Sequence, residues 1–226
     1  MQSSAITSDW KSYHGWANKK IRSSVQGGML VRWIMAIGWA FPTALTLPLI
    51  SLVIEERNPA GVLVLIFPLV AVILFYRALS PVIGEARFGQ VVFEMSPYPG
   101  IVGGQIGGKI KGPLFSKIIQ AQPNTKFRAS LCCMHFYTSR VGSDETTHND
   151  TIWSKSIEPT VILDANESCL ALSIDTPEKL RGADLNRNFN HYYWQLTVRG
   201  EMRGVDFVRQ YNLPVFKTAI EDSKVA

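Results

Sequence analysis

Three groups of residues in this chain have types and spacing that could support chemistry. In the first, Gly103, Gly108 and Lys109 match a phosphate-binding loop as far as the lysine. Such a loop continues with Ser or Thr and then a helix, whose N-terminus receives the phosphate. Here Ile110 follows and no helix is predicted, so we interpret the glycines as a place where a strand approaches another backbone closely.

The second group consists of Cys132, Cys133 and His135. On a strand, Cys133 and His135 would share one face, as two zinc ligands could. A structural zinc site needs about four ligands, and His148 and His191 are remote in sequence. Cysteine is among the most buried residue types, so we expect core packing, no metal and no cofactor.

The third group would form a nucleophile set of Cys133, His191 and Asp206. No Gly-x-Ser-x-Gly elbow or comparable signature accompanies these residues. We therefore expect a protein without catalytic residues. An enzyme with a Cys-based site at Cys133 stays open as an alternative.

The longest features of the chain are two apolar segments near its N-terminus. Residues 33–54 contain no charged side chain, and residues 60–76 form a second uncharged run. About 20 apolar residues suffice to span a bilayer as a helix. Because residues 55–59 are a very short connector, the sequence predicts a two-helix transmembrane hairpin over residues 29–77.

The distribution of Lys and Arg predicts the orientation of this hairpin. The tail before the first span holds five such residues, whereas the connector holds only Arg57 beside two glutamates. Basic residues favour the cytoplasmic side, so both termini should face the cytoplasm. The three cysteines, all in residues 78–226, are then expected to be free thiols in a reducing compartment.

The N-terminal tail, residues 1–28, has two readings that the sequence leaves open. It is either an amphipathic helix at the membrane surface or a loosely ordered basic segment. Aromatic and basic side chains near the spans are expected at the level of the lipid headgroups. These membrane-interface residues are Trp10, Tyr13, Trp16, Lys19, Lys20, Arg22, Arg32 and Arg77.

Residues 78–226 have the pattern of a separate all-β domain. From residue 88 onward, seven or eight short strands alternate with turn signals, and no convincing helix follows residue 85. Such spacing is typical of an antiparallel β-sandwich. The domain is nearly neutral, with 16 Lys and Arg against 15 Asp and Glu, so we expect no nucleic-acid partner.

Several segments of this domain resemble an arrestin-type lobe. They are GGQIGGKIKGPL at 103–114, LCCMHFYTSR at 131–140, LALSIDTPEKL at 170–180, HYYWQLTVRGEM at 191–202 and GVDFVRQYNLPVF at 204–216. With the two-span anchor, the chain is similar to a family of bacterial membrane proteins of unknown function. The resemblance implies a membrane-anchored all-β protein of the bacterial inner membrane, with one immunoglobulin/arrestin-like sandwich. It brings no catalytic residues.

From these features we expect a non-enzymatic protein that binds or scaffolds a partner protein at the lipid bilayer. Contacts should come from an edge strand or from the loops at 141–150 and 176–190. The expected contact residues in the second loop are Arg181, Asp184 and Arg187. An accessory subunit of a larger membrane complex is the alternative, and homo-oligomer formation stays open.

Overall fold

The computed structural model describes residues 10–12, 16–23, 33–45, 62–141, 144–164, 167–185 and 189–217. Three of the predicted site residues, Tyr13, Arg32 and Arg187, lie outside these ranges. The chain forms two compact units. One, which we call the β-lobe, combines Met1–Ser24 with Phe88–Ala226, and the other is the helical unit Val25–Arg87.

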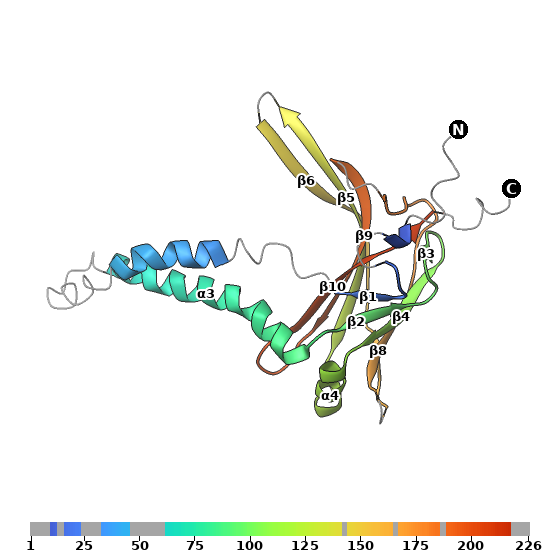
Figure 1. Ribbon diagram of the computed structural model, residues 1–226, viewed down its shortest axis with the longest axis horizontal. Coiled ribbons are helices and arrows are strands. Elements are labelled where there is room, and N and C mark those ends of the chain that lie inside the picture. Colours follow the sequence, from blue (N-terminus) through green and yellow to red (C-terminus); the bar gives the residue numbers. More distant parts are fainter. Residues whose placement is uncertain are drawn as a thin grey trace. The chain divides into compact units, whose positions relative to one another are not determined.

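The helical unit contains a helix at Trp33–Leu45 and helix α3 at Val62–Phe88. Their side chains contact one another in antiparallel order: Trp33 meets Phe75 at 5.8 Å, and Trp39 stacks on Phe67 at 6.0 Å. The two helices therefore form a packed pair, drawn in blue and green in Figure 1. Among the described residues, only the stretch Ile66–Phe88 of α3 is long and apolar enough to cross a membrane.

Two antiparallel sheets form the β-lobe (Figure 1). The five-stranded sheet has the order β1 (Lys20–Arg22), β2 (Val92–Met95), β4 (Gln105–Lys111), β8 (Cys169–Asp175) and β7 (Thr160–Ile162). The four-stranded sheet has the order β10 (Phe207–Leu213), β9 (Asn190–Gly200), β5 (Phe127–Val141) and β6 (Asp144–Ile157). A short parallel pair joins β3 (Gly100–Ile101) to β11 (Val215–Phe216).

The inner faces of both sheets supply a single hydrophobic core. Alternate residues point inward, as period-2 strands require. From the five-stranded sheet these include Phe93 and Ile110, and from the four-stranded sheet Leu131, Trp194 and Tyr211, all fully buried. The predicted antiparallel β-sandwich is therefore confirmed.

A helix follows residue 85, contrary to the prediction. Helix α4 (Pro113–Ala121) starts with Pro113 in its first turn, where a missing N–H costs nothing. Phe115 and Ile119, one turn apart, are fully buried, and Phe115 stacks on Phe207 at 4.3 Å. At nine residues, the helix is too short to form alone, so packing against the sandwich determines it.

The described part of the N-terminal tail contains no α-helix, which contradicts the amphipathic-helix reading. It consists of a 3-10 turn, η1 (Trp10–Ser12), and strand β1. Ile21 lies opposite Phe93 in the β1–β2 pair and is buried. The helix prediction considered residues 1–28 by themselves. In the folded chain, apolar side chains of the tail such as Trp16 and Ile21 are instead buried in the sandwich.

Candidate functional site

The hairpin of β5 and β6 extends beyond the body of the sandwich (Figure 1). Strand β9 pairs with β5 only as far as Asn190 opposite Tyr137, whereas β6 continues to Asp144 opposite Val141. Strand β6 is 14 residues long and ends the sheet order, so among the described strands it pairs with β5 alone. We call its other side the free edge of β6.

The register shows which backbone groups face this free edge. The N–H of Thr138 donates to Phe189 O at 2.8 Å, toward the β9 side of β5. Successive residues of a strand present their N–H and C=O groups to opposite sides. Tyr137 therefore bonds toward β6, where His148 lies opposite. On β6, the neighbours Thr147 and Asn149 consequently point their N–H and C=O groups away from β5.

Four rings stack in a row across three strands at this end of the lobe. Tyr192 lies flat on His135 at 4.3 Å and 6°, His135 stacks on Tyr137 at 5.0 Å, and Tyr137 stacks on His148 at 4.9 Å. We call Tyr192, His135, Tyr137 and His148 the ring row. Because His135 and Tyr137 alternate with Cys133 along β5, the ring row lies on the same face of the four-stranded sheet as the buried Cys133. Its four rings, however, are only half-buried.

Polar groups accompany the ring row. Asp150 lies opposite His135, and its hydrogen bond with the Tyr137 hydroxyl raises the pKa of Tyr137. The Arg181 guanidinium lies over the Tyr192 ring at 5.1 Å. The arrangement therefore offers flat apolar surface, a carboxylate and exposed backbone groups on one face of the lobe.

The predicted contact residues Arg181 and Asp184 belong to a loop that is fixed to the lobe. The Arg181 carbonyl accepts the indole N–H of Trp194 at 2.9 Å. Asp184 donates its N–H to Tyr192 O at 2.8 Å, and its carboxylate accepts the Tyr192 N–H at 2.7 Å. Strand β10 ends at Leu213, which lies opposite Trp194 on β9. Beyond that point, Asp184 takes the place of β10 as the hydrogen-bond partner of Tyr192 on β9. Both side chains remain exposed, and a partner contact by them stays a prediction.

Most of the described interface residues are exposed, but Trp16 is not. Lys19, Lys20 and Arg22 lie exposed in and beside β1, and Arg77 is exposed on α3. The ring of Trp16, by contrast, is only 4% exposed and packs edge-on against Phe216. The prediction that Trp16 lies at lipid headgroups is therefore wrong, because its ring fills the β-lobe core.

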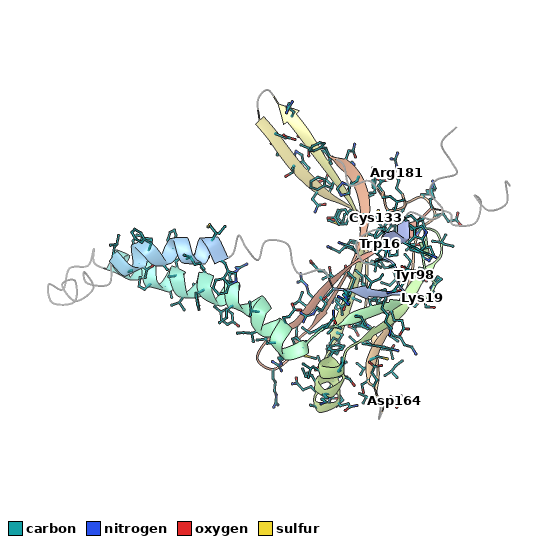
Figure 2. All side chains as sticks on the ribbon, viewed as in Figure 1. Trp16, Lys19, Tyr98, Cys133, Asp164 and Arg181 are labelled. Carbon is teal, nitrogen blue, oxygen red and sulfur yellow. The ribbon has the colours of Figure 1, made fainter. Side chains whose placement is uncertain are left out.

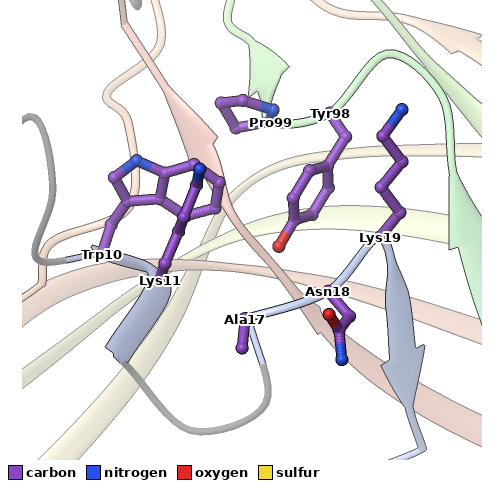
Figure 3. Close-up of a pocket in the computed structure, with 7 residues that line it drawn as sticks. All are labelled: Trp10, Lys11, Ala17, Asn18, Lys19, Tyr98 and Pro99. Atoms are coloured by element: carbon purple, nitrogen blue, oxygen red, sulfur yellow. The ribbon is translucent and has the colours of Figure 1, made fainter.

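The folded tail creates a pocket of about 380 Å³ (Figure 3). The strap pocket, as we name it, is lined by Trp10, Lys11, Ala17, Asn18, Lys19, Tyr98 and Pro99. The rings of Trp10 and Tyr98 contact each other at 5.3 Å, and Trp10 also contacts Phe216. Sequence reasoning missed this site, because Tyr98 is about 80 residues from the tail that covers it.

The Cys133 alternative is not supported by its surroundings. Burial raises the pKa of the Cys133 thiol to about 11, with a further contribution from Cys132. Its sulfur lies 3.9 Å from the Arg181 carbonyl oxygen, and Figure 2 labels both residues. Trp194 lies opposite Cys133 on β9, so His191, an odd number of residues away, faces the other side of the sheet.

Asp206 precedes Phe207, which pairs with Gly200 on β9, whereas Cys133 lies opposite Trp194, farther along the same strand. The Asp206 carboxylate accepts the backbone N–H of Met202. The three residues of the predicted nucleophile set are therefore not brought together. In the part of the chain that the structure describes, no group of three His, Cys, Asp or Glu side chains could hold a metal ion.

Two of the three comparisons with known proteins found no match. No protein-family model matches the chain, and no curated protein matches it. Among solved structures, the chain is similar to Spo0M, a sporulation control protein from Bacillus subtilis, with 14% identity and a TM-score of 0.37. The match covers 56% of this chain and 48% of Spo0M, so it spans about half of that protein and transfers no activity.

Proposed function

We propose that this chain is a two-span membrane protein whose β-lobe binds a segment of a partner protein at the free edge of β6. The observation that carries the proposal is the 14-residue edge strand with unpaired backbone groups at Thr147 and Asn149. Exposed edges of this length are templates for an added strand. The partner's backbone would pair with β6, and its side chains would contact the ring row.

The membrane anchor in this proposal is supported by the exposed side chains of the helical unit. Large apolar residues on both helices face outward, and water is an unfavourable surrounding for such a surface. They are Ile34, Met35, Ile37, Phe41, Leu45, Ile66, Leu69, Val72, Ile73, Phe75 and Tyr76. A bilayer would cover them without any further protein.

The pairing of β1 with β2 supports two spans rather than one. β1 precedes the helical unit and β2 follows it, yet Ile21 lies directly opposite Phe93 in one sheet. Any membrane crossings between them must therefore be even in number. The basic tail favours the cytoplasm as the common side, and the bacterial inner membrane is the location that the family resemblance implies.

Single cysteines test this topology in a variant without the native cysteines. Asn18→Cys and Ser154→Cys place thiols at exposed positions of the β-lobe, and Glu56→Cys places one in the connector. With a membrane-impermeant maleimide, we expect positions 18 and 154 to label from one side and position 56 from the other. Labelling of positions 18 and 154 from opposite sides would contradict the proposal.

A photo-crosslinking experiment tests the edge of β6. Benzoylphenylalanine at Ile152, which is 51% exposed on β6, should give a discrete adduct in native membranes. Thr147→Pro removes an outward N–H that the lobe does not use, so it should block strand addition without breaking the β5–β6 ladder. Thr147→Ala keeps that N–H and should keep the adduct.

Two results would count against strand addition at β6. One is an adduct of equal yield in the Thr147→Pro variant, and the other is no adduct in any variant. The accessory-subunit alternative predicts a different outcome, in which a complex of fixed stoichiometry is extracted in mild detergent whether or not residue 147 is proline.

A further inference from the structure

The strap pocket lies within the β-lobe, apart from β6, and is closed on one side by the folded tail. Its wall is built by Trp10, Tyr98 and Pro99, with Trp10 and Tyr98 tilted by 59° to each other. The two rings are in direct contact, and the Lys11 ammonium lies over the Trp10 ring, 5.7 Å from its centroid. A flat molecule could lie against this wall and gain the usual benefit of burying aromatic surface.

The charged residues of the strap pocket are both positive. Among the described residues, Lys11 and Lys19 line it and no acidic residue does. Figure 3 shows their side chains on the two sides of the Tyr98 ring. In the described ranges neither lysine forms an ion pair, while Lys111 and Lys155 do. Two ammonium groups beside aromatic rings favour an anionic occupant.

The Tyr98 hydroxyl is not available to this occupant. It donates a hydrogen bond to the Trp16 carbonyl. Burial also raises the pKa of Tyr98, so the ring stays uncharged at neutral pH. The polar contacts offered to a ligand therefore come from the two ammonium groups and from the exposed amide of Asn18.

We infer that the strap pocket binds a small organic anion that combines a planar ring with a carboxylate or phosphate group. The ring would pack on Trp10 and Tyr98, and the anionic group would contact the ammonium group of Lys11 or that of Lys19. The volume of about 380 Å³ lies in the range of pockets that hold small ligands. This site is independent of strand addition at β6, and either can fail without the other.

Fluorine NMR of the full-length chain in nanodiscs gives a readout specific to this pocket. With 5-fluorotryptophan, the six tryptophans each carry a label, and Trp10→Phe identifies the Trp10 resonance. The probes are 2-naphthoate and adenosine monophosphate. Their matched neutral molecules are 2-naphthalenemethanol and adenosine, and inorganic phosphate is the anion without a ring.

We expect at least one of the two ring-bearing anions to shift the Trp10 resonance saturably and to leave the buried Trp194 unchanged. In the Lys11→Gln/Lys19→Gln double variant, binding should weaken about tenfold or more, because each lost charge contact contributes on the order of a few-fold in affinity. Lys117→Gln, at an exposed position on α4, is the matched control and should bind like the unaltered chain.

Four results would overturn the inference. If the neutral molecules bind as tightly as their anions, the pocket recognises apolar surface alone. If inorganic phosphate shifts Trp10 with the same affinity, the ring plays no part. If no probe shifts Trp10 saturably, or if the double variant binds unchanged, the strap pocket is not an organic-anion site. Unaltered resonances of the other tryptophans in the double variant would exclude unfolding as the cause of lost binding.

Discussion

The indole N–H of Trp16 donates a hydrogen bond to the backbone carbonyl of Asn212, 196 positions later in the chain, over 2.9 Å. The same tryptophan accepts the hydroxyl hydrogen of Tyr98 at its carbonyl. Trp16 thus connects the N-terminal tail both to β10 and to the turn before β3. The tail, which precedes the helical unit, is a structural part of the β-lobe.

This connection predicts a large effect of Trp16 on stability. Trp16→Ala should lower the free energy of unfolding of the β-lobe by about 3–5 kcal/mol, as for other large buried aromatic residues. Trp16→Phe keeps most of the apolar contact and loses the hydrogen bond to Asn212, so about 1–2 kcal/mol is expected. Urea unfolding of the full chain in nanodiscs, followed by the β-sheet circular dichroism signal, measures both.

Lys20→Ala is the control for Trp16, because Lys20 lies exposed in the same tail. Its effect should stay within about 0.5 kcal/mol. If Trp16→Ala were equally mild, the tail would not be part of the folded lobe in solution, and the argument for an even number of membrane crossings would lose its support.

Gly108 explains the glycine-rich run at 103–108 in structural terms. Its φ of +153° is one that other residues rarely adopt, and an added Cβ would lie 2.2 Å from the Glu94 carbonyl oxygen on β2. We expect Gly108→Ala to destabilise the lobe by more than about 2 kcal/mol, since both backbone strain and a clash with backbone arise. The midpoint of thermal unfolding provides the measurement.

Gly104→Ala is the matched control within the same run. The nearest atom to its added Cβ, the Ile101 carbonyl oxygen, is 3.3 Å away, and no positive φ is required there. A much smaller change is expected. Equal effects of the two substitutions would show that the close approach of β4 to β2 does not determine the need for glycine at position 108.

The glycine run shows which features the sequence could predict. Close backbone approach follows from the residue type alone, and alternation along 88–217 was enough to predict two packed sheets. Burial of Cys133 was also predictable, because small apolar residues in a strand centre are usually core. These are local properties, in which a residue and its near neighbours carry the information.

The tail and α4 show where this reasoning fails. Trp16 and Ile21 read as part of an amphipathic surface because their burial depends on Asn212 and Phe93, which are distant in sequence. Helix α4 is stabilised because its Phe115 stacks on Phe207 of β10, which is distant in sequence. The strap pocket depends on the same long-range fold, and so does the ring row, which needs rings from β5, β6 and β9.

The buried hydroxyl of Tyr211 leads to a prediction about stability. Its ring is fully buried beside Phe93, and its hydroxyl has no hydrogen-bond partner in the described part of the lobe. Tyr211→Phe removes this unpaired polar group and should raise the free energy of unfolding by about 1 kcal/mol at pH 7. Denaturant unfolding in the presence of the membrane anchor measures the difference.

Burial also raises the pKa of Tyr211 above its ordinary value of 10.0. Above pH 10 the unfolded chain therefore releases a proton that the folded chain retains, and stability falls as the pH rises. Tyr211→Phe should lose less stability between pH 9 and 11 than the unaltered chain. Some loss should persist, because the pKa of Cys133 is raised as well. Identical pH profiles would contradict the assignment.

The three cysteines should differ in their reactivity toward a thiol reagent. Cys133 and Cys169 are buried, whereas Cys132 is partly exposed. Only the thiolate reacts rapidly, and burial raises the pKa of Cys133 to about 11. At pH 7.5 we expect one fast modification per chain, at Cys132, and modification of the other two only after unfolding. Mass spectrometry of peptides from the labelled chain locates the modified residue.

This experiment also decides the enzyme alternative, which requires a reactive thiolate at Cys133. Cys132→Ser should abolish fast labelling, and Cys169→Ser should leave it unchanged. Fast labelling of Cys133 in the folded Cys132→Ser variant would show that the sandwich opens at the Arg181 loop or that the thiol is activated. Fast labelling would favour a catalytic role for Cys133, but a group other than His191 or Asp206 would have to activate the thiol, because neither is positioned to do so.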